Sequence, residues 1–90
     1  MAALFPLGRI TATPCALAAL NDAETLPLEL LSRHQTGDWG DVPPEDAREN
    51  EVSVRYGFRV LSSYGVAGER LWIITEHDRS HTTILLPKEY

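Results

Sequence analysis

Two polar segments carry the residue types that could do chemistry in this chain. Residues 37–44 read GDWGDVPP, and residues 76–80 read EHDRS, followed by His81. Imidazole and carboxylate groups at one turn can bind a metal ion or transfer protons. We favour a structural interpretation instead. Asp78 caps its own turn, and Arg79 pairs with Asp78 or with Glu76.

Trp39 admits two interpretations. Buried, its side chain would remove about 150–250 Å² from solvent and anchor the loop, with Asp38 and Asp41 as loop and helix caps. Exposed, it would be an aromatic anchor in an acidic rim, a combination typical of binding hot spots for basic partners. We favour the buried interpretation.

A pocket shared by the two polar segments is an alternative site. It requires the two segments to lie within one side-chain reach of each other and to line a concavity. Such a pocket would make the chain a small enzyme or a ligand-binding protein. Its candidate residues are His34, Asp38, Trp39, His77, Asp78 and Arg79.

The common enzyme signatures are missing from the sequence. It contains no GxGxxG, GxxxxGK[ST], HExxH, CxxC or GxSxG motif, so we assign no catalytic residue, cofactor or metal. A single cysteine, Cys15, excludes an internal disulfide. Its Ala/Leu-rich segment predicts a well-buried helix and a buried thiol.

The negative charge is concentrated in one segment. The formal net charge is −5, and residues 38–51 hold six acids against Arg48 alone, while the charges elsewhere cancel. Such a patch repels nucleic-acid phosphates and attracts basic protein surfaces. We therefore predict a protein partner with a basic surface and no direct nucleic-acid binding; the alternative is a merely solvated helix face. The predicted partner-binding residues are Asp38, Trp39, Asp41, Glu45, Asp46 and Glu49.

Three helices are expected to position these segments. The first runs from Pro14 to about Asn21, with Thr13 as its N-cap. The second covers about 26–34 and has a leucine stripe. The third covers about 43–56, because prolines suit the donor-free first turn and acids complement the helix dipole there.

Alternating apolar residues predict strands in the C-terminal third. The three segments are 58–64, 70–76 and 81–86. Their short connections indicate an antiparallel meander, with Trp72 in the core. Residues 4–11 suit a short edge strand or an extended lead-in. The fold class is therefore α+β, with two or three helices on one face of a three- or four-stranded antiparallel sheet in one domain, 1–90.

Two further expectations concern location and assembly. No run approaches the ~20 apolar residues that cross a bilayer, and residues 1–9 lack the basic region of a secretory signal. We expect a cytoplasmic protein without a membrane partner. Homodimerisation through an exposed strand edge, either residues 81–86 or the N-terminal segment, is another hypothesis.

Three motifs carry a family resemblance over about residues 10–90. They are RHxxGDWGD, LSxY and WIITExDRSxTTxLLP. On these motifs the chain resembles a family of small bacterial proteins of plasmids and integrated elements, commonly labelled plasmid-related protein or type I restriction modification subunit. Members often have Thr and Lys where this chain has Glu69 and Arg70, so no role is carried onto that turn. The positions marked by the family pattern are Arg33, His34, Gly37, Asp38, Trp39, Gly40, Asp41, Asp78, Arg79 and Ser80.

The resemblance implies a mobile-element context and no particular reaction. Our leading hypothesis is a non-enzymatic protein-interaction module that acts on a basic protein surface through the acidic segment. Host defence machinery, such as CRISPR or restriction complexes, is a candidate target, because it exposes Lys/Arg surfaces that bind nucleic acid.

Overall fold

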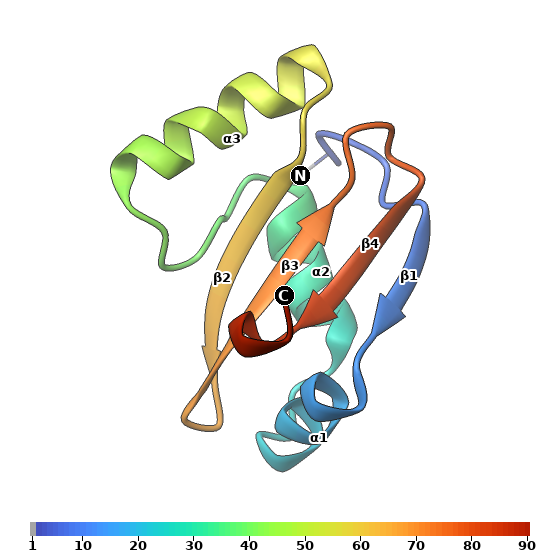
Figure 1. Ribbon diagram of the computed structural model, residues 1–90, viewed down its shortest axis with the longest axis vertical. Helices are drawn as coiled ribbons and strands as arrows, with labels where there is room; N and C mark the ends of the chain where they lie inside the picture. Colours follow the sequence, from blue (N-terminus) through green and yellow to red (C-terminus); the bar gives the residue numbers. More distant parts are fainter. Residues whose placement is uncertain (1) are drawn as a thin grey trace.

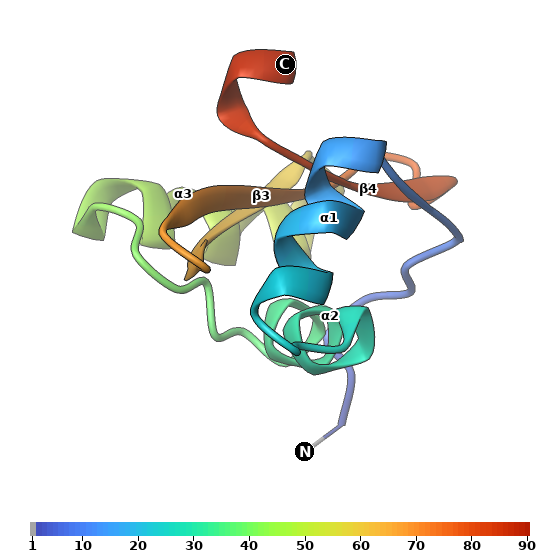
Figure 2. The same cartoon turned by 90° about the horizontal axis from the view of Figure 1, so that it is seen from below.

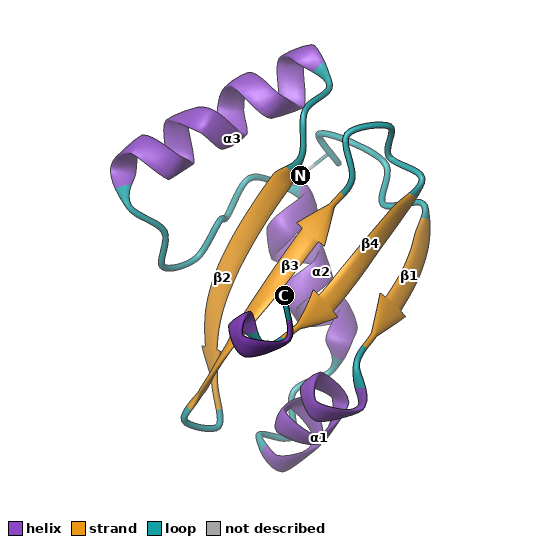
Figure 3. Cartoon of the chain, in the orientation of Figure 1, coloured by secondary structure: helices purple, strands orange, loops and turns teal. Residues whose placement is uncertain are grey.

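The computed structural model describes residues 2–90 and has a four-stranded sheet with three α-helices (Figures 1 and 3). The α+β class predicted from the sequence is confirmed. No helix in this part of the chain is long and apolar enough to cross a membrane. In chain order the elements are β1 (Arg9–Ala12), α1 (Pro14–Asp22), α2 (Pro27–Gln35), α3 (Pro44–Tyr56), β2 (Val60–Val66), β3 (Glu69–Thr75), β4 (His81–Leu85) and a 3₁₀ helix (Pro87–Glu89).

The sheet is mixed, with strand order β1-β4-β3-β2. Strands β2, β3 and β4 form the predicted antiparallel meander, whereas β1 runs parallel to β4. The reason lies at Gly8, whose φ is +67° and whose added Cβ would lie 2.4 Å from the carbonyl oxygens of Arg79 and Ser80. The chain therefore enters β1 at the turn where β4 begins, and both strands leave that turn in the same direction.

The same order corrects one assembly hypothesis. Strand β4 lies between β1 and β3, so residues 81–86 are not a free edge. The N-terminal candidate does contain an edge strand, β1.

Helices α1 and α2 lie against one face of the sheet (Figure 2), and α3 lies beside β2 at the sheet edge (Figure 1). The prediction of two or three helices on one face is therefore confirmed with two, α1 and α2, while α3 lies at the edge. The main core lies between the two helices and the sheet, and its largest buried members include Leu20, Leu30, Leu31, Tyr64, Leu71, Ile73 and Ile84.

The C-terminal segment, residues 87–90, lies on the face of the sheet opposite to α1 and α2 (Figure 2). There Tyr90 packs edge-on against Trp72, with ring centroids 5.9 Å apart. Trp72 is half-buried on this second face, so its predicted place in the core is corrected.

The helix ends follow their local signals. The Thr13 hydroxyl accepts a hydrogen bond from Ala16 N at 3.1 Å, as an N-cap should, and Gly57 ends α3 with φ +80°. Helix α1 is less enclosed than expected, because it buries only Ala16, Ala19 and Leu20. Its opposite side faces solvent and carries Cys15, whose thiol is exposed rather than buried.

Candidate functional site

Residues 39–41 close the β2 edge of the sheet. Ser63 N donates to Trp39 O at 3.0 Å, and Asp41 N donates to Ser63 O at 2.7 Å, which makes a parallel bridge at Gly40. Gly40 has φ +73°, and an added Cβ would lie 2.1 Å from Ser63 O. Only glycine permits this approach, so the segment acts as a very short additional strand.

Trp39 anchors this short strand from the interior. Its side chain is 7% exposed and belongs to a second core cluster with Phe5 and Val60. The Phe5 ring stacks on it at 6.4 Å, and the His34 imidazole meets it edge-on at 6.1 Å. Trp39 is therefore buried and has almost no surface to offer a partner.

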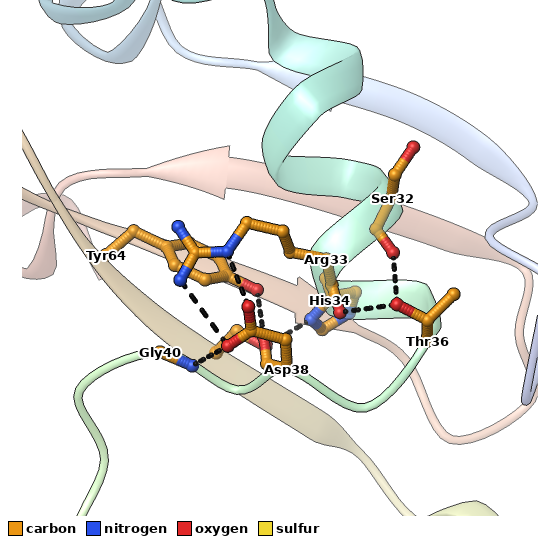
Figure 4. Close-up of polar contacts among 8 residues, drawn as sticks. Ser32, Arg33, His34, Thr36, Asp38, Gly40 and Tyr64 are labelled. Carbon is orange, nitrogen blue, oxygen red and sulfur yellow. Dashed lines mark hydrogen bonds and ion pairs between the residues drawn. The ribbon is translucent and has the colours of Figure 1, made fainter. Parts of the chain in front are cut away.

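Asp38 holds the loop through local contacts (Figure 4). Its carboxylate accepts from Arg33 Nε at 2.7 Å and from Gly40 N at 3.2 Å. The Arg33 hydrogen bond holds the Asp38 pKa below its usual value. The Arg33 guanidinium lies 4.5 Å from the Tyr64 ring centroid, and the Tyr64 hydroxyl donates to Asp38 O at 2.6 Å.

The second aspartate of the motif is also paired within the chain. Arg70 Nη1 donates to Asp41 Oδ2 at 2.8 Å. Asp38, Trp39 and Asp41, three of the predicted partner-binding residues, thus make intramolecular contacts that fix the loop.

Asn50 closes the next part of the same edge. Its side-chain amide donates to Leu61 O at 2.8 Å and accepts from Leu61 N at 3.1 Å. One amide thus satisfies both backbone groups of an edge residue, as a neighbouring strand would. This contact also fixes α3 beside β2.

Helix α3 carries a cluster of four exposed acids. Glu45, Asp46, Glu49 and Glu51 are exposed and form no ion pair within residues 2–90. Three large apolar side chains at the C-terminal end of α3 or just after it are also exposed: Val52 (48%), Tyr56 (66%) and Phe58 (56%). A shallow hollow of about 400 Å³ lies here, lined by Glu49, Val52, Ser53, Phe58 and Arg59.

His34 is fully buried and hydrogen-bonded at both ring nitrogens. Nδ1 lies 2.6 Å from Ser62 Oγ, and Nε2 lies 2.9 Å from Thr75 Oγ1. Thr75 Oγ1 is 2.7 Å from Thr82 Oγ1, which donates to Leu7 O at 2.7 Å.

The Leu7 carbonyl, at the end of this series of hydrogen bonds, fixes the direction of each bond, because a carbonyl oxygen can only accept. Thr82 gives its one proton to Leu7 O, so Thr75 donates to Thr82 and His34 donates from Nε2 to Thr75. Nδ1 then accepts from Ser62. Burial, with a smaller effect of Arg79, lowers the His34 pKa to about 3, so the imidazole is neutral and structural.

The sequence analysis did not predict this hydrogen-bond network, although the strands contain a signal for it. Polar residues at 62, 75 and 82 occupy strand positions on the helix-covered face, where apolar residues are expected. A buried polar donor or acceptor was needed there, and His34 supplies it.

The EHDRS turn is also structural. Asp78 Oδ1 accepts from Ser80 N at 3.0 Å, which is the predicted capping role. Arg79 differs from the prediction: its guanidinium binds backbone carbonyls rather than a carboxylate, donating to Ser53 O at 2.7 Å and Phe58 O at 2.6 Å. It thereby ties the C-terminal end of α3 to the β3–β4 turn.

Phe5 lies between the two polar segments and contacts one residue of each. The Phe5 ring stacks on Trp39, and its centroid lies 5.3 Å from the Arg79 guanidinium carbon. Phe5 thus fills the space between them, and His34 and Trp39 lie in the interior instead of lining an open pocket. His77 is exposed. Among the described residues, no group of three or more His, Cys, Asp or Glu side chains is placed to hold a metal ion.

No family model, curated protein or solved structure matches this chain. The exposed surface of α3 is therefore the feature from which we infer a function.

Proposed function

We propose that this chain is a non-enzymatic protein-interaction module of a mobile genetic element and binds a basic protein surface through α3. The observation that carries the proposal is the set of four exposed acids on α3 that form no ion pair with any side chain of residues 2–90. Asp38 and Asp41 are excluded from this surface, because Arg33 and Arg70 already pair with them.

The chemistry of the surface favours a protein partner. Exposed apolar side chains at 52, 56 and 58 can lose water on contact, while carboxylates at 45, 46 and 49 can pair with Lys or Arg around them. An apolar centre with a charged rim is the usual arrangement of a protein interface. Nucleic acid is disfavoured, since carboxylates repel phosphates.

The surface is also held in place before binding. Asn50 fixes the middle of α3 to β2, and Arg79 binds the carbonyl of Ser53 near its C-terminal end. A rigid helix loses little conformational freedom on binding, so more of the contact energy appears as affinity.

Host defence complexes of the CRISPR or restriction type are the proposed targets. Their nucleic-acid channels present clustered Lys and Arg side chains, which attract an acidic helix by long-range electrostatics. If this protein occupied such a channel, the nucleic acid of the mobile element would escape recognition.

A charge-reversal comparison tests the proposal. The partner is captured from the native host and identified by mass spectrometry, and its affinity is measured by calorimetry at several salt concentrations. We expect Glu45→Lys/Asp46→Lys/Glu49→Lys to weaken binding at least about tenfold and to flatten the salt dependence.

The matched control carries the same charge change elsewhere. Asp22→Lys/Glu24→Lys/Glu29→Lys reverses three exposed acids on and between α1 and α2. Equal losses in both variants would show that net charge alone matters, and unchanged affinity in the α3 variant would exclude α3 as the contact. Thermal melts confirm that both variants are folded.

A further inference from the structure

Strand β1 is an open edge of the sheet. Arg9 N donates to Ser80 O and Thr13 N donates to Ile84 O, both at 3.0 Å. Because backbone groups alternate along a strand, the N–H and C=O groups of Ile10 and Ala12 point away from β4. The Ile10 side chain is 48% exposed, so this edge is uncovered.

We propose that β1 pairs antiparallel with β1 of a second copy across a two-fold axis, joining the two four-stranded sheets into one continuous sheet. This surface is separate from α3, which lies beside the opposite edge strand β2 (Figure 1). The inference therefore stands independently of the proposed function.

Only one register uses all the free backbone groups. With the axis at Thr11, Ile10 lies opposite Ala12 of the second copy, and the two residues exchange two hydrogen bonds on each side of the axis. An axis at Ile10 would place Ala12 opposite Gly8, whose φ of +67° is not extended. An axis at Ala12 would place Ile10 opposite Pro14, which has no N–H.

The register also brings opposite charges together. Thr11 Oγ1 lies 3.1 Å from Thr83 Oγ1, and the Thr13 hydroxyl donates to Glu89 Oε1 at 2.8 Å. Arg9, Thr11 and Thr13 therefore share the sheet face that the C-terminal segment crosses. Arg9 would lie opposite Thr13 of the second copy and so beside its Glu89.

This complementarity favours a second copy over a foreign strand. Arg9 is exposed and has no ion-pair partner anywhere in residues 2–90. The edge carries a positive charge at one end and a negative charge at the other, so a two-fold axis pairs each with its opposite. Because the contact is short, we expect a reversible dimer that dissociates in the micromolar to millimolar range.

Sedimentation equilibrium of the intact chain tests the proposal. From low micromolar to about millimolar protein, we expect the mass to rise from 10.0 kDa toward twice that value. Ile10→Pro removes one outward N–H from each copy but keeps the bonds that Arg9 and Thr13 make to β4. It should raise the dimer dissociation constant about tenfold or more, whereas Ile10→Val should change it little.

A charge swap provides an independent test. Arg9→Glu and Glu89→Arg should each weaken the dimer, and the double variant should recover most of the lost affinity. No recovery, with melting curves showing folded protein, would overturn the Arg9–Glu89 pairing.

Amide hydrogen exchange locates the contact. The amides of Ile10 and Ala12 should become protected as protein concentration rises, while those of Leu61 and Ser63 are protected at every concentration. A chain that stays monomeric to millimolar concentration overturns the proposal. So does a dimer whose dissociation constant is unchanged in Ile10→Pro, because it must form through another surface.

Discussion

The two edges of the sheet differ in how their backbone groups are satisfied. At β2, the Asn50 amide binds both groups of Leu61, and residues 39–41 bind both groups of Ser63. At β1, no hydrogen bond from elsewhere in residues 2–90 covers the outward groups of Ile10 and Ala12. Unpaired edges recruit other strands, so the cover at Leu61 and Ser63 opposes strand pairing at β2, and β1 is the edge that our dimer proposal uses.

The GDWGD segment, residues 37–41, completes the β2 edge. A glycine lets the backbone reach Ser63, a tryptophan holds the segment from the interior, and an aspartate on each side pairs with an arginine. Residues 38–41, which were candidates for a binding site, instead complete the β2 edge of the sheet. The exposed acids of the 38–51 segment that form no ion pair within residues 2–90 lie on α3, the helix that follows.

Removing the anchor should have the largest effect on the closed edge. We expect Trp39→Ala to destabilise the protein by about 3–5 kcal/mol, because it leaves a cavity beside Phe5 and His34. Urea unfolding measures the loss, and faster exchange of the Ser63 amide would report the opened edge. Trp72→Ala, at a half-buried position on the other face, is the control and should cost clearly less.

Acid should loosen the same half of the molecule through His34. The folded-state pKa is about 3 against about 6.5 unfolded, so the unfolded chain binds a proton first and stability falls as pH drops from about 6.5 toward 3. The expected loss at pH 4 is about 3 kcal/mol. Urea midpoints measured from pH 7 to 4 check it.

Two variants separate this effect from general acid sensitivity. His77→Gln, at an exposed position, should keep the pH dependence, and His34→Gln should remove most of it between pH 6.5 and 4. An equal slope in His34→Gln and the parent chain would contradict the assignment.

Replacing the edge-capping amide should have an intermediate effect. Asn50→Leu leaves both backbone groups of Leu61 without a partner, which should cost about 1–3 kcal/mol. It should also expose a second free edge, so light scattering should detect association that Ile10→Pro does not suppress. Glu51→Gln, at the exposed neighbouring position, should leave stability and association unchanged.

The surface ion pair of the loop should matter least. Asp41→Asn removes the contact with Arg70, in which both side chains are well exposed, and the expected loss is below about 1 kcal/mol. High salt should reduce the difference from the parent chain. A loss of several kcal/mol would mean that the substitution had also broken the backbone hydrogen bond from Asp41 N to Ser63 O.

Much of the fold was predictable because its signals are local. Thr13 and Pro14 start α1, Gly57 ends α3, and alternating residues define β2, β3 and β4. The candidate site was predictable only in part. Trp39 was favoured as buried and Asp78 as a cap, but no local pattern shows that Phe5 separates Trp39 from Arg79.

The sequence by itself determined the helices, the meander and the acidic third helix, because capping, proline placement and alternation depend on residues within a few positions of one another. Only the tertiary structure decided that β1 runs parallel to β4, that Asn50 caps Leu61 and that His34 joins the hydroxyls of two strands. It also separated Asp38 and Asp41, which pair with Arg33 and Arg70, from the α3 acids, which form no ion pair within residues 2–90. These outcomes are contacts between residues far apart in the sequence. Such contacts are decided by how the whole core packs, so no local pattern predicts them.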